Sequence, residues 1–136
     1  MTIAVIDGQG GRMGALLVES MRRAGIGAPH RVLAIGTNAL ATSAMLKAGA
    51  DQGATGANPV IVASRTADVI IGPIGVVIAD ALLGEITPAM AVAVGQSAAE
   101  KLLLPVNTCA NIVVGVAETG VGALARRTIE LLEGLL

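Results

Sequence analysis

The sequence predicts an α/β fold in three layers, in which a mostly parallel sheet of five or six strands carries helices on both faces. Short apolar runs alternate with longer segments of helical periodicity, which is the order expected of a parallel sheet with helical crossovers. The apolar runs are continuous, as in strands buried on both faces. Glycine, proline and small polar residues follow these runs, where open parallel sheets bind ligands.

The amino-terminal part begins with a predicted buried strand at residues 3–6 and a glycine-rich loop at residues 8–14. A helix is expected to start near Arg12, because apolar side chains then recur at the spacing of one helix face. A second strand is predicted at residues 32–35, followed by a helix at residues 39–48 that stops at a glycine.

The middle of the chain is predicted to contain a loop at residues 49–59, where glycine, asparagine and proline are frequent. Short third and fourth strands are expected at residues 60–63 and 69–71. Residues 76–83 are apolar on nearly every side, which favours a buried helix.

The carboxyl-terminal part is predicted to begin with a helix over residues 88–101. Thr87 is a good N-cap, and proline suits the first helical position that follows it. Strands at residues 102–106 and 112–116 would complete the sheet, and a final amphipathic helix starts after Gly120.

The length and composition predict one domain over residues 1–136. A chain of 136 residues is of ordinary single-domain size and can bury a core without disulfides. Its net charge of −1 argues against a nucleic-acid partner, which usually meets a basic patch. The absence of Phe, Tyr and Trp also removes the side chains on which single-stranded bases stack.

Cysteine usage and the start of the sequence predict a reducing, cytoplasmic location. Cys109 is the only cysteine, and the first residues resemble a strand rather than a signal peptide. We expect no membrane span, because the most apolar run is broken by Gly72, Pro73 and Gly75 well short of about 18 residues.

The loop after the first strand predicts a phosphate site. A helix that starts there would direct free N–H groups at an anion, and glycine would let the backbone approach it. The alternative is a tight strand–helix turn that needs glycine for packing alone. The residues expected to hold the phosphate are Gly8, Gln9, Gly10, Gly11, Arg12, Met13 and Gly14.

Asp7 stands directly before this loop, where a carboxylate would repel a phosphate. We expect it to accept hydrogen bonds from the loop amides and so hold the turn. The alternative is a role in holding Mg²⁺ against a phosphate. We predict no metal site, because the other strand ends supply no second carboxylate.

The remaining strand ends supply further candidate ligand-binding residues. Thr37 and Asn38 could bond a ribose or phosphate, cap the next helix, or do both. The usual acidic ribose-binding residue of NAD-binding folds is missing there. Gly72, Pro73 and Ile74 either let a ring lie against the backbone or form a tight turn, and Asn107 is expected to close the far side.

For Cys109 and Glu85, the sequence favours a structural role over a chemical one. Cys109 lacks a cationic partner, which favours a small buried residue over a nucleophile. Glu85 is expected to take part in capping near Thr87 or to be solvated, with a role as an acid or base in the site as the alternative.

Two resemblances extend these predictions. The string "GQGGRMG" resembles the cofactor loop of dihydrodipicolinate reductases, which bind NADH or NADPH, over about the first twenty residues. The motifs "IDGQGG", "GTNALATSAMLKAGA", "GATG", "IIGPIGVVIADALLGEITPAMA" and "LLLPVN" resemble a family of small bacterial proteins called domain of unknown function number 3842 over nearly the whole chain. This second resemblance implies a single Rossmann-like domain and no particular activity.

The sequence therefore predicts a small nucleotide-binding module with NAD or NADP as its cofactor. No histidine, lysine or tyrosine follows a strand to move a proton, so a binding or sensing role is preferred to catalysis. A small NAD(P)-dependent reductase is the first alternative. A structural or partner-binding protein without a cofactor is the second, and the apolar excess predicts a homo-oligomer.

Overall fold

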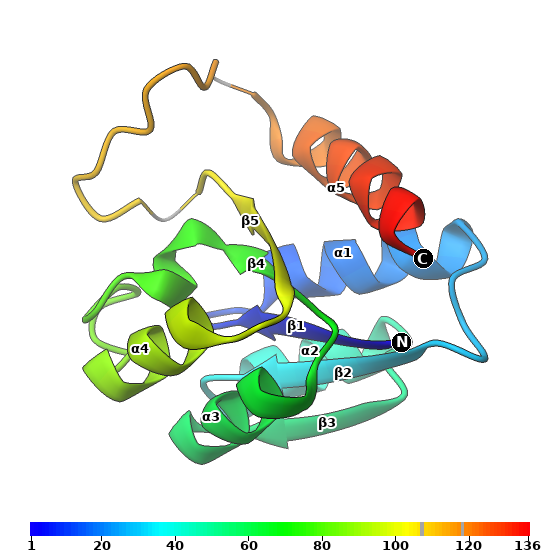
Figure 1. The fold of residues 1–136 in the computed structure, drawn as a ribbon, viewed down its shortest axis with the longest axis horizontal. Coiled ribbons are helices and arrows are strands. Elements are labelled where there is room, and N and C mark those ends of the chain that lie inside the picture. Colours follow the sequence, from blue (N-terminus) through cyan, green and yellow to red (C-terminus); the bar gives the residue numbers. More distant parts are fainter. Residues whose placement is uncertain (107, 118) are drawn as a thin grey trace.

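The computed structural model describes residues 1–106, 108–117 and 119–136. In these residues five parallel strands form one sheet in the order β3-β2-β1-β4-β5 (Figure 1). The strands are β1 (Thr2–Asp7), β2 (Arg31–Gly36), β3 (Gln52–Thr55), β4 (Val69–Pro73) and β5 (Glu100–Leu104). The predicted α/β class and parallel sheet are confirmed. The strand order reverses between β1 and β4, which is where open sheets bind ligands.

Helices cover both faces of the sheet, as predicted (Figure 1). One face carries α1 (Arg12–Arg23), α2 (Ala39–Lys47) and α5 (Val121–Leu135), and the other carries α3 (Ala57–Thr66) and α4 (Pro88–Gln96). Alternate side chains of β1 serve the two faces. Ile3 and Val5 join the core under α1, whereas Ala4 and Ile6 join the core under α3 and α4.

The predicted third strand is wrong, because residues 60–63 lie in the helix α3. Pro59 stands in the first turn of this helix, where its missing N–H costs no intrahelical bond. Val60, Ala63 and Ser64 are the buried positions, which is helical spacing. The third strand is instead β3, inside the predicted loop. Its sequence QGAT has no apolar run, and it joins the sheet by backbone pairing with β2.

The segment after β4 also differs from the prediction. Residues 76–83 form no α-helix: a 3-10 turn, η1 (Ile74–Val77), gives way to irregular turns. The backbone is left-handed at Asp80, Leu82 and Leu83, which no continuous right-handed helix allows. Buried side chains such as Ala81 explain the apolar sequence without a helix.

The carboxyl-terminal elements are partly as predicted. Thr87 caps α4 by accepting a hydrogen bond from the Met90 N–H at 3.2 Å, but the helix ends at Gln96 rather than near residue 101. β5 therefore begins two residues before its predicted start. Residues 112–116 form no strand; they belong to an extended segment that leaves the body between β5 and α5 (Figure 1).

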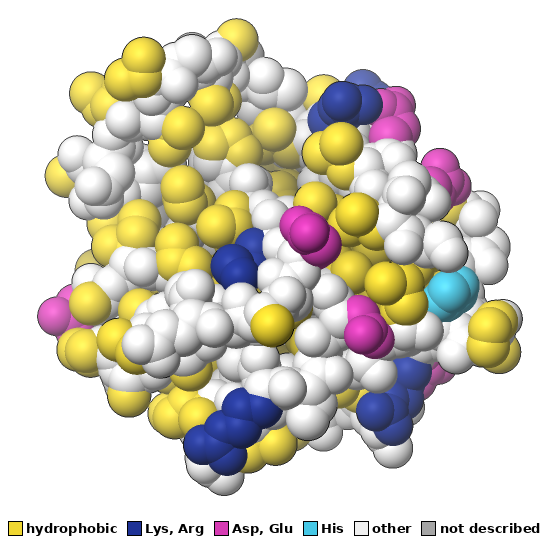
Figure 2. Space-filling view, viewed as in Figure 1, with side chains coloured by type: hydrophobic (Ala, Val, Ile, Leu, Met, Phe, Trp, Pro, Cys, Tyr) yellow, Lys and Arg dark blue, Asp and Glu magenta, His cyan; other side chains and the backbone are white. Residues whose placement is uncertain are grey.

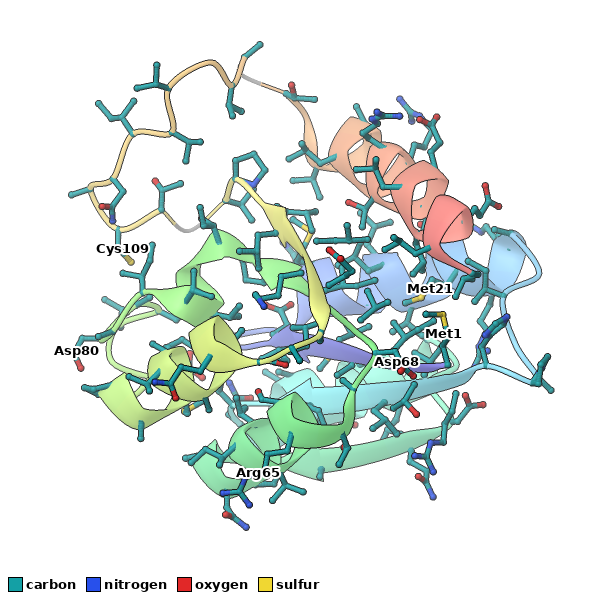
Figure 3. All side chains as sticks on the ribbon, in the orientation of Figure 1. Met1, Met21, Arg65, Asp68, Asp80 and Cys109 are labelled. Atoms are coloured by element: carbon teal, nitrogen blue, oxygen red, sulfur yellow. The ribbon has the colours of Figure 1, made fainter. Side chains whose placement is uncertain are left out.

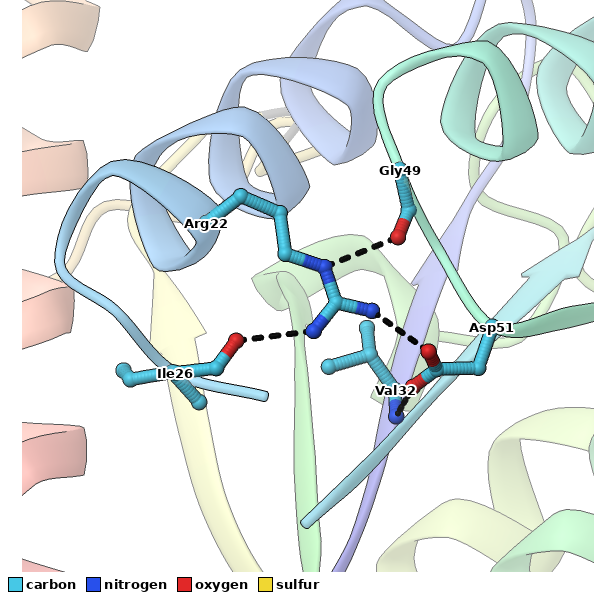
Figure 4. A network of polar contacts seen from close by, with 5 residues as sticks. All are labelled: Arg22, Ile26, Val32, Gly49 and Asp51. Carbon is cyan, nitrogen blue, oxygen red and sulfur yellow. Dashed lines mark hydrogen bonds and ion pairs between the residues drawn. The ribbon is translucent and has the colours of Figure 1, made fainter. Parts of the chain in front are cut away.

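The end of α1 is fixed by the guanidinium of Arg22 (Figure 4). Its Nε donates to the Gly49 carbonyl at 2.8 Å, and its Nη1 donates to the Ile26 carbonyl at 2.7 Å. Nη2 lies 2.8 Å from Asp51, which also accepts from the Val32 N–H at 2.7 Å. One side chain thus joins α1, the turn after it, the end of α2 and the edge of the sheet.

Candidate functional site

The loop between β1 and α1 lies at the carboxyl edge of the sheet, beside the reversal of strand order. An open groove of about 470 Å³ passes over this loop toward the start of α5. One wall is the loop backbone, and the other is apolar. The residues that line the groove are Asp7, Gly8, Gln9, Gly10, Gly11, Arg12, Met13, Leu16, Val106 and Val121.

Asp7 holds the loop, as the first of its two predicted roles requires. Its side chain is buried, and its two oxygens accept hydrogen bonds from the Gly8 N–H at 2.8 Å and the Gly14 N–H at 2.7 Å. Burial raises the pKa of Asp7 above its ordinary value, against the two hydrogen bonds, and the negative charge of Glu85 raises this pKa further. A carboxylate of the protein therefore already occupies part of the amino terminus of α1.

Two glycines of the loop are required by packing. Gly11 has a left-handed φ of 71°, and a Cβ built there would lie 2.6 Å from Cα of Ala41 in α2. Gly14 packs α1 against α2 so closely that a Cβ would overlap the side chain of Met45. These contacts support the packing interpretation of both positions.

Gly8 and Gly10 differ from each other in the space that a Cβ would find. A Cβ at Gly8 would lie 2.5 Å from Oγ1 of Thr37 and 2.9 Å from the side chain of Leu82, so the ends of β1 and β2 are already in contact and covered. At Gly10 the nearest atom would be Cγ of Arg12, 4.0 Å away. Gly10 is the one glycine of the loop that packing does not explain.

Glu85 does not line the groove, but it contacts the glycine-rich loop, a position that the sequence interpretation placed second to capping and solvation. Its carboxylate accepts hydrogen bonds from the Gln9 N–H at 2.9 Å, the Thr37 hydroxyl at 2.9 Å and the Asn38 side-chain amide at 2.5 Å. Burial acts to raise the pKa of Glu85, but the three hydrogen bonds outweigh it and leave this pKa below its ordinary value. The spacing of the sequence gave no signal for a contact across 76 positions.

Thr37 and Asn38 come together with the loop, as predicted. Asn38 caps α2 by accepting from the Ala41 N–H at 2.9 Å, while its amide also donates to the Gln9 carbonyl at 2.9 Å. The predicted capping role is therefore present, and the predicted bond to a ribose or phosphate stays a prediction. The other side-chain contacts of Asn38 are with Glu85 and Gln9.

The third group of predicted site residues lies outside the groove lining. Gly72 and Pro73 are buried at the end of β4, and a Cβ at Gly72 would overlap the carbonyl oxygen of Ile6 in β1. Ile74 opens the 3-10 turn η1. Gly72 therefore allows β4 to approach β1 closely, and the turn follows only at Ile74. Asn107 lies outside the described residues.

The backbone N–H groups of the loop differ in whether they have an acceptor within the protein. The Gln9 N–H is taken by Glu85, and the Gly11 N–H donates to the Gly8 carbonyl at 2.9 Å. Among the described residues, the N–H groups of Gly10 and Arg12 have no hydrogen-bond acceptor, and the Arg12 side chain forms no ion pair. These groups can hold an anion of modest size.

Other reactive groups lie apart from this arrangement. Cys109 is exposed on the segment between β5 and α5, so its predicted burial is wrong (Figure 3). No three metal-ligating side chains cluster within residues 1–106, 108–117 and 119–136. Over the same ranges, no helix has the length and apolarity needed to cross a membrane.

The apolar wall was missed by the sequence analysis. Leu16 lies one turn into α1, and Val106 and Val121 flank the extended segment. Each is an ordinary apolar residue in a chain that is 54 % hydrophobic, so the sequence offered no signal to single them out.

Comparison with known proteins gives one structural similarity and one family. No curated protein matches the sequence. A solved structure described as a dodecameric FMN-dependent UbiX-like decarboxylase from Escherichia coli O157:H7 is 14 % identical, with a TM-score of 0.45, over 98 % of this chain and 95 % of that one. That protein is described as FMN-dependent, which contradicts the predicted NAD or NADP cofactor, and the closed ends of β1 and β2 give the physical reason. A family model matches residues 2–136, and the chain belongs to the family described as "Domain of unknown function (DUF3842)".

Proposed function

We propose that the chain is a binding module for a small molecule that carries one phosphate monoester, such as a mononucleotide. The phosphate would lie on the Gly10 and Arg12 N–H groups with the Arg12 guanidinium beside it. The observation that carries this proposal is that the Gly10 and Arg12 N–H groups have no acceptor among the described residues, whereas the N–H groups of Gly8, Gln9, Gly11 and Gly14 are used within the protein. A charge-assisted contact between the phosphate and the Arg12 guanidinium would add to the hydrogen bonds from the two amides.

The rest of the ligand would lie along the apolar wall of the groove. Leu16, Val106 and Val121 suit a ring or an aliphatic group better than a second charged group. The ends of β1 and β2 leave little room for the adenosine half of a dinucleotide, because even a Cβ at Gly8 would meet the Thr37 hydroxyl and the Leu82 side chain. This geometry favours a mononucleotide-sized ligand.

FMN and riboflavin test the proposal, since they differ only by the phosphate. A chain without Phe, Tyr or Trp adds almost no fluorescence, so flavin anisotropy reports binding directly. We expect FMN to bind at least tenfold more tightly than riboflavin. Arg12→Ala should weaken FMN by about tenfold or more, because a hydrogen bond to a charged group contributes about 1.5–3 kcal/mol.

Two variants sharpen this experiment. Gly10→Glu places a carboxylate in the groove at a position where a Cβ meets no close neighbour, so the fold should persist while FMN binding is lost. Arg65→Ala is the matched control, because this exposed arginine lies on α3 on the other face of the sheet (Figure 3). Equal affinity for FMN and riboflavin, or no effect of FMN, AMP and inorganic phosphate on the Gly10 amide resonance, would refute the proposal.

A second candidate role is self-association, which the exposed apolar segment between β5 and α5 favours. Ile112 is 90 % and Val114 94 % exposed, and residues 105–117 include no charged side chain. Figure 2 shows apolar side chains gathered over this part of the molecule. Such a surface would be covered by an apolar, uncharged partner, and a second copy supplies one.

Light scattering during size-exclusion chromatography tests self-association. We expect the wild-type chain to be larger than a monomer at tens of micromolar, and Ile112→Asp combined with Val114→Asp to dissociate it. Leu83→Asp is the control, because Leu83 is 98 % exposed on a different segment. A monomeric wild-type chain, or an equal effect of Leu83→Asp, would contradict this role.

A further inference from the structure

The ends of β1 and β2 form a seat for a carboxylate. Three neutral donors point to the same place: the Gln9 N–H, the Thr37 hydroxyl and the Asn38 side-chain amide. They come from two loops that meet only in the folded sheet. Their occupant is Glu85, so an oxyanion is actually held there and the seat is not inferred from donors alone. Because the acceptor is a charged carboxylate, these hydrogen bonds are stronger than those between neutral groups.

The segment that delivers Glu85 is an irregular strap over residues 78–87. Ile86 and Leu82 anchor it in the core under α3 and α4, and the Asp80 N–H closes it on the Ile86 carbonyl at 2.7 Å. At its apex Leu83 is 98 % exposed. The φ angles of Asp80, Leu82 and Leu83 are 64°, 55° and 55°, a conformation unfavourable for residues with side chains. The strap thus adopts a strained path that ends with Glu85 in the seat.

Glu85 also decides which loop amides remain for a ligand. Because it takes the Gln9 N–H and Asp7 takes those of Gly8 and Gly14, only part of the loop stays free. A ligand with a second anionic group beside the first would meet the Glu85 carboxylate where that group needs donors. Like charges repel, and the donors of Gln9, Thr37 and Asn38 are already used by Glu85.

We propose that Glu85 is a specificity-determining residue: an internal anion that fills the oxyanion seat at the ends of β1 and β2 and restricts ligands to one phosphate. This inference rests on the proposed function for its ligand, but the existence of the seat does not depend on it. Without Glu85, the seat should accept a small carboxylate from solution.

Acetate tests the seat, because it is the functional group of Glu85 without the chain. Glu85→Ala removes the occupant, whereas Glu85→Gln keeps the seat filled with an uncharged side chain of the same size. We expect acetate to shift the Gln9 amide resonance of Glu85→Ala saturably in the millimolar range. Neither the wild-type chain nor Glu85→Gln should respond. A folded Glu85→Ala chain without a saturable shift, or equal shifts in all three proteins, would overturn the proposal.

Acetate also provides the control for a Glu85→Ala variant that fails to fold. If this variant is unfolded in chloride, 100 mM acetate should restore its far-ultraviolet circular dichroism, since a ligand that binds only the folded state stabilises it. Failure of acetate to restore the fold would overturn the proposal as well.

AMP and ADP test the restriction to one phosphate, because they differ only by the second phosphate. In competition with FMN the wild-type chain should prefer AMP, and the ratio of the ADP to the AMP dissociation constant should fall at least tenfold in Glu85→Ala. An unchanged ratio would refute the role in specificity. Absence of FMN binding in every variant would refute the proposed function instead, and acetate would still decide whether the seat holds an anion.

Discussion

Replacing Gly11 by alanine should destabilise the fold far more than the same change at Gly10. At Gly11 the new methyl group would adopt a left-handed backbone, which costs about 1–2 kcal/mol. It would also lie 2.6 Å from Cα of Ala41, a backbone atom that cannot turn aside, and such overpacking costs about 1–3 kcal/mol. A smaller entropy loss of the unfolded chain offsets part of this. The net expectation is a loss of about 3 kcal/mol.

Urea denaturation followed by far-ultraviolet circular dichroism measures this loss in a chain without aromatic fluorescence. A loss of about 3 kcal/mol also corresponds to a fall in Tm of roughly 10 °C for a domain of this size. Gly10→Ala is the control, because its Cβ would meet only Cγ of Arg12 at 4.0 Å. It should change the free energy of unfolding by less than about 0.5 kcal/mol. Equal effects of the two substitutions would refute the division of the loop into packing and ligand-facing glycines.

Two further predictions concern the network around the end of α1. Arg22→Lys should destabilise the fold by about 2 kcal/mol, nearly as much as Arg22→Ala, because one ammonium group cannot replace the three-way contact of the guanidinium; urea denaturation of both variants checks this. The Val32 N–H and Arg22 hold the pKa of Asp51 below its ordinary value. The Asp51 carboxylate therefore stabilises the fold at pH values above its unfolded-state pKa. This stabilisation is lost as the pH falls through its folded-state pKa. The wild-type chain should therefore lose more stability between pH 7 and pH 3 than Asp51→Asn does, and parallel pH profiles would contradict this.

The sheet was predictable where burial controls the sequence. β1, β2 and β4 lie inside the sheet, and their apolar runs follow from the need to serve two cores at once. β3 is an edge strand with a mostly exposed QGAT sequence, and backbone pairing with β2 determines it instead. Edge position therefore explains why this strand was missed.

The false helix at residues 76–83 and the false strand at residues 60–63 have one cause. An apolar run reports burial, and burial occurs in helices, strands and irregular segments alike. In α3 the deciding feature was a proline in the first turn, and after β4 it was a set of left-handed residues that no propensity indicates. Elements with a cap signal, such as Thr87 before α4, were placed correctly at that end.

The location of the candidate site could be predicted from the sequence, but the distribution of charge in it could not. The loop of residues 8–14 and the Thr37–Asn38 pair meet as the topology requires. The contact of Asp7 with the loop amides was predicted, but the sequence could not indicate that Glu85 competes for donors of the same loop. Asp7 takes the Gly8 and Gly14 N–H groups, and Glu85 arrives from a segment whose path depends on strained turns.

This competition changes what a glycine-rich loop can be taken to indicate. The string "GQGGRMG" resembles a loop that holds a dinucleotide, yet here Gly11 and Gly14 serve contacts with α2, and Gly8 lies against the end of β2. Four backbone donors of residues 8–14 are satisfied within the protein, two of them by Asp7 alone. An anion can gain only from donors that are not already used, so a loop's capacity for phosphate depends on its free amides rather than on its glycines. Under the proposed function, the free amides of this loop suit one phosphate, and two acidic side chains that a motif comparison does not consider set that limit.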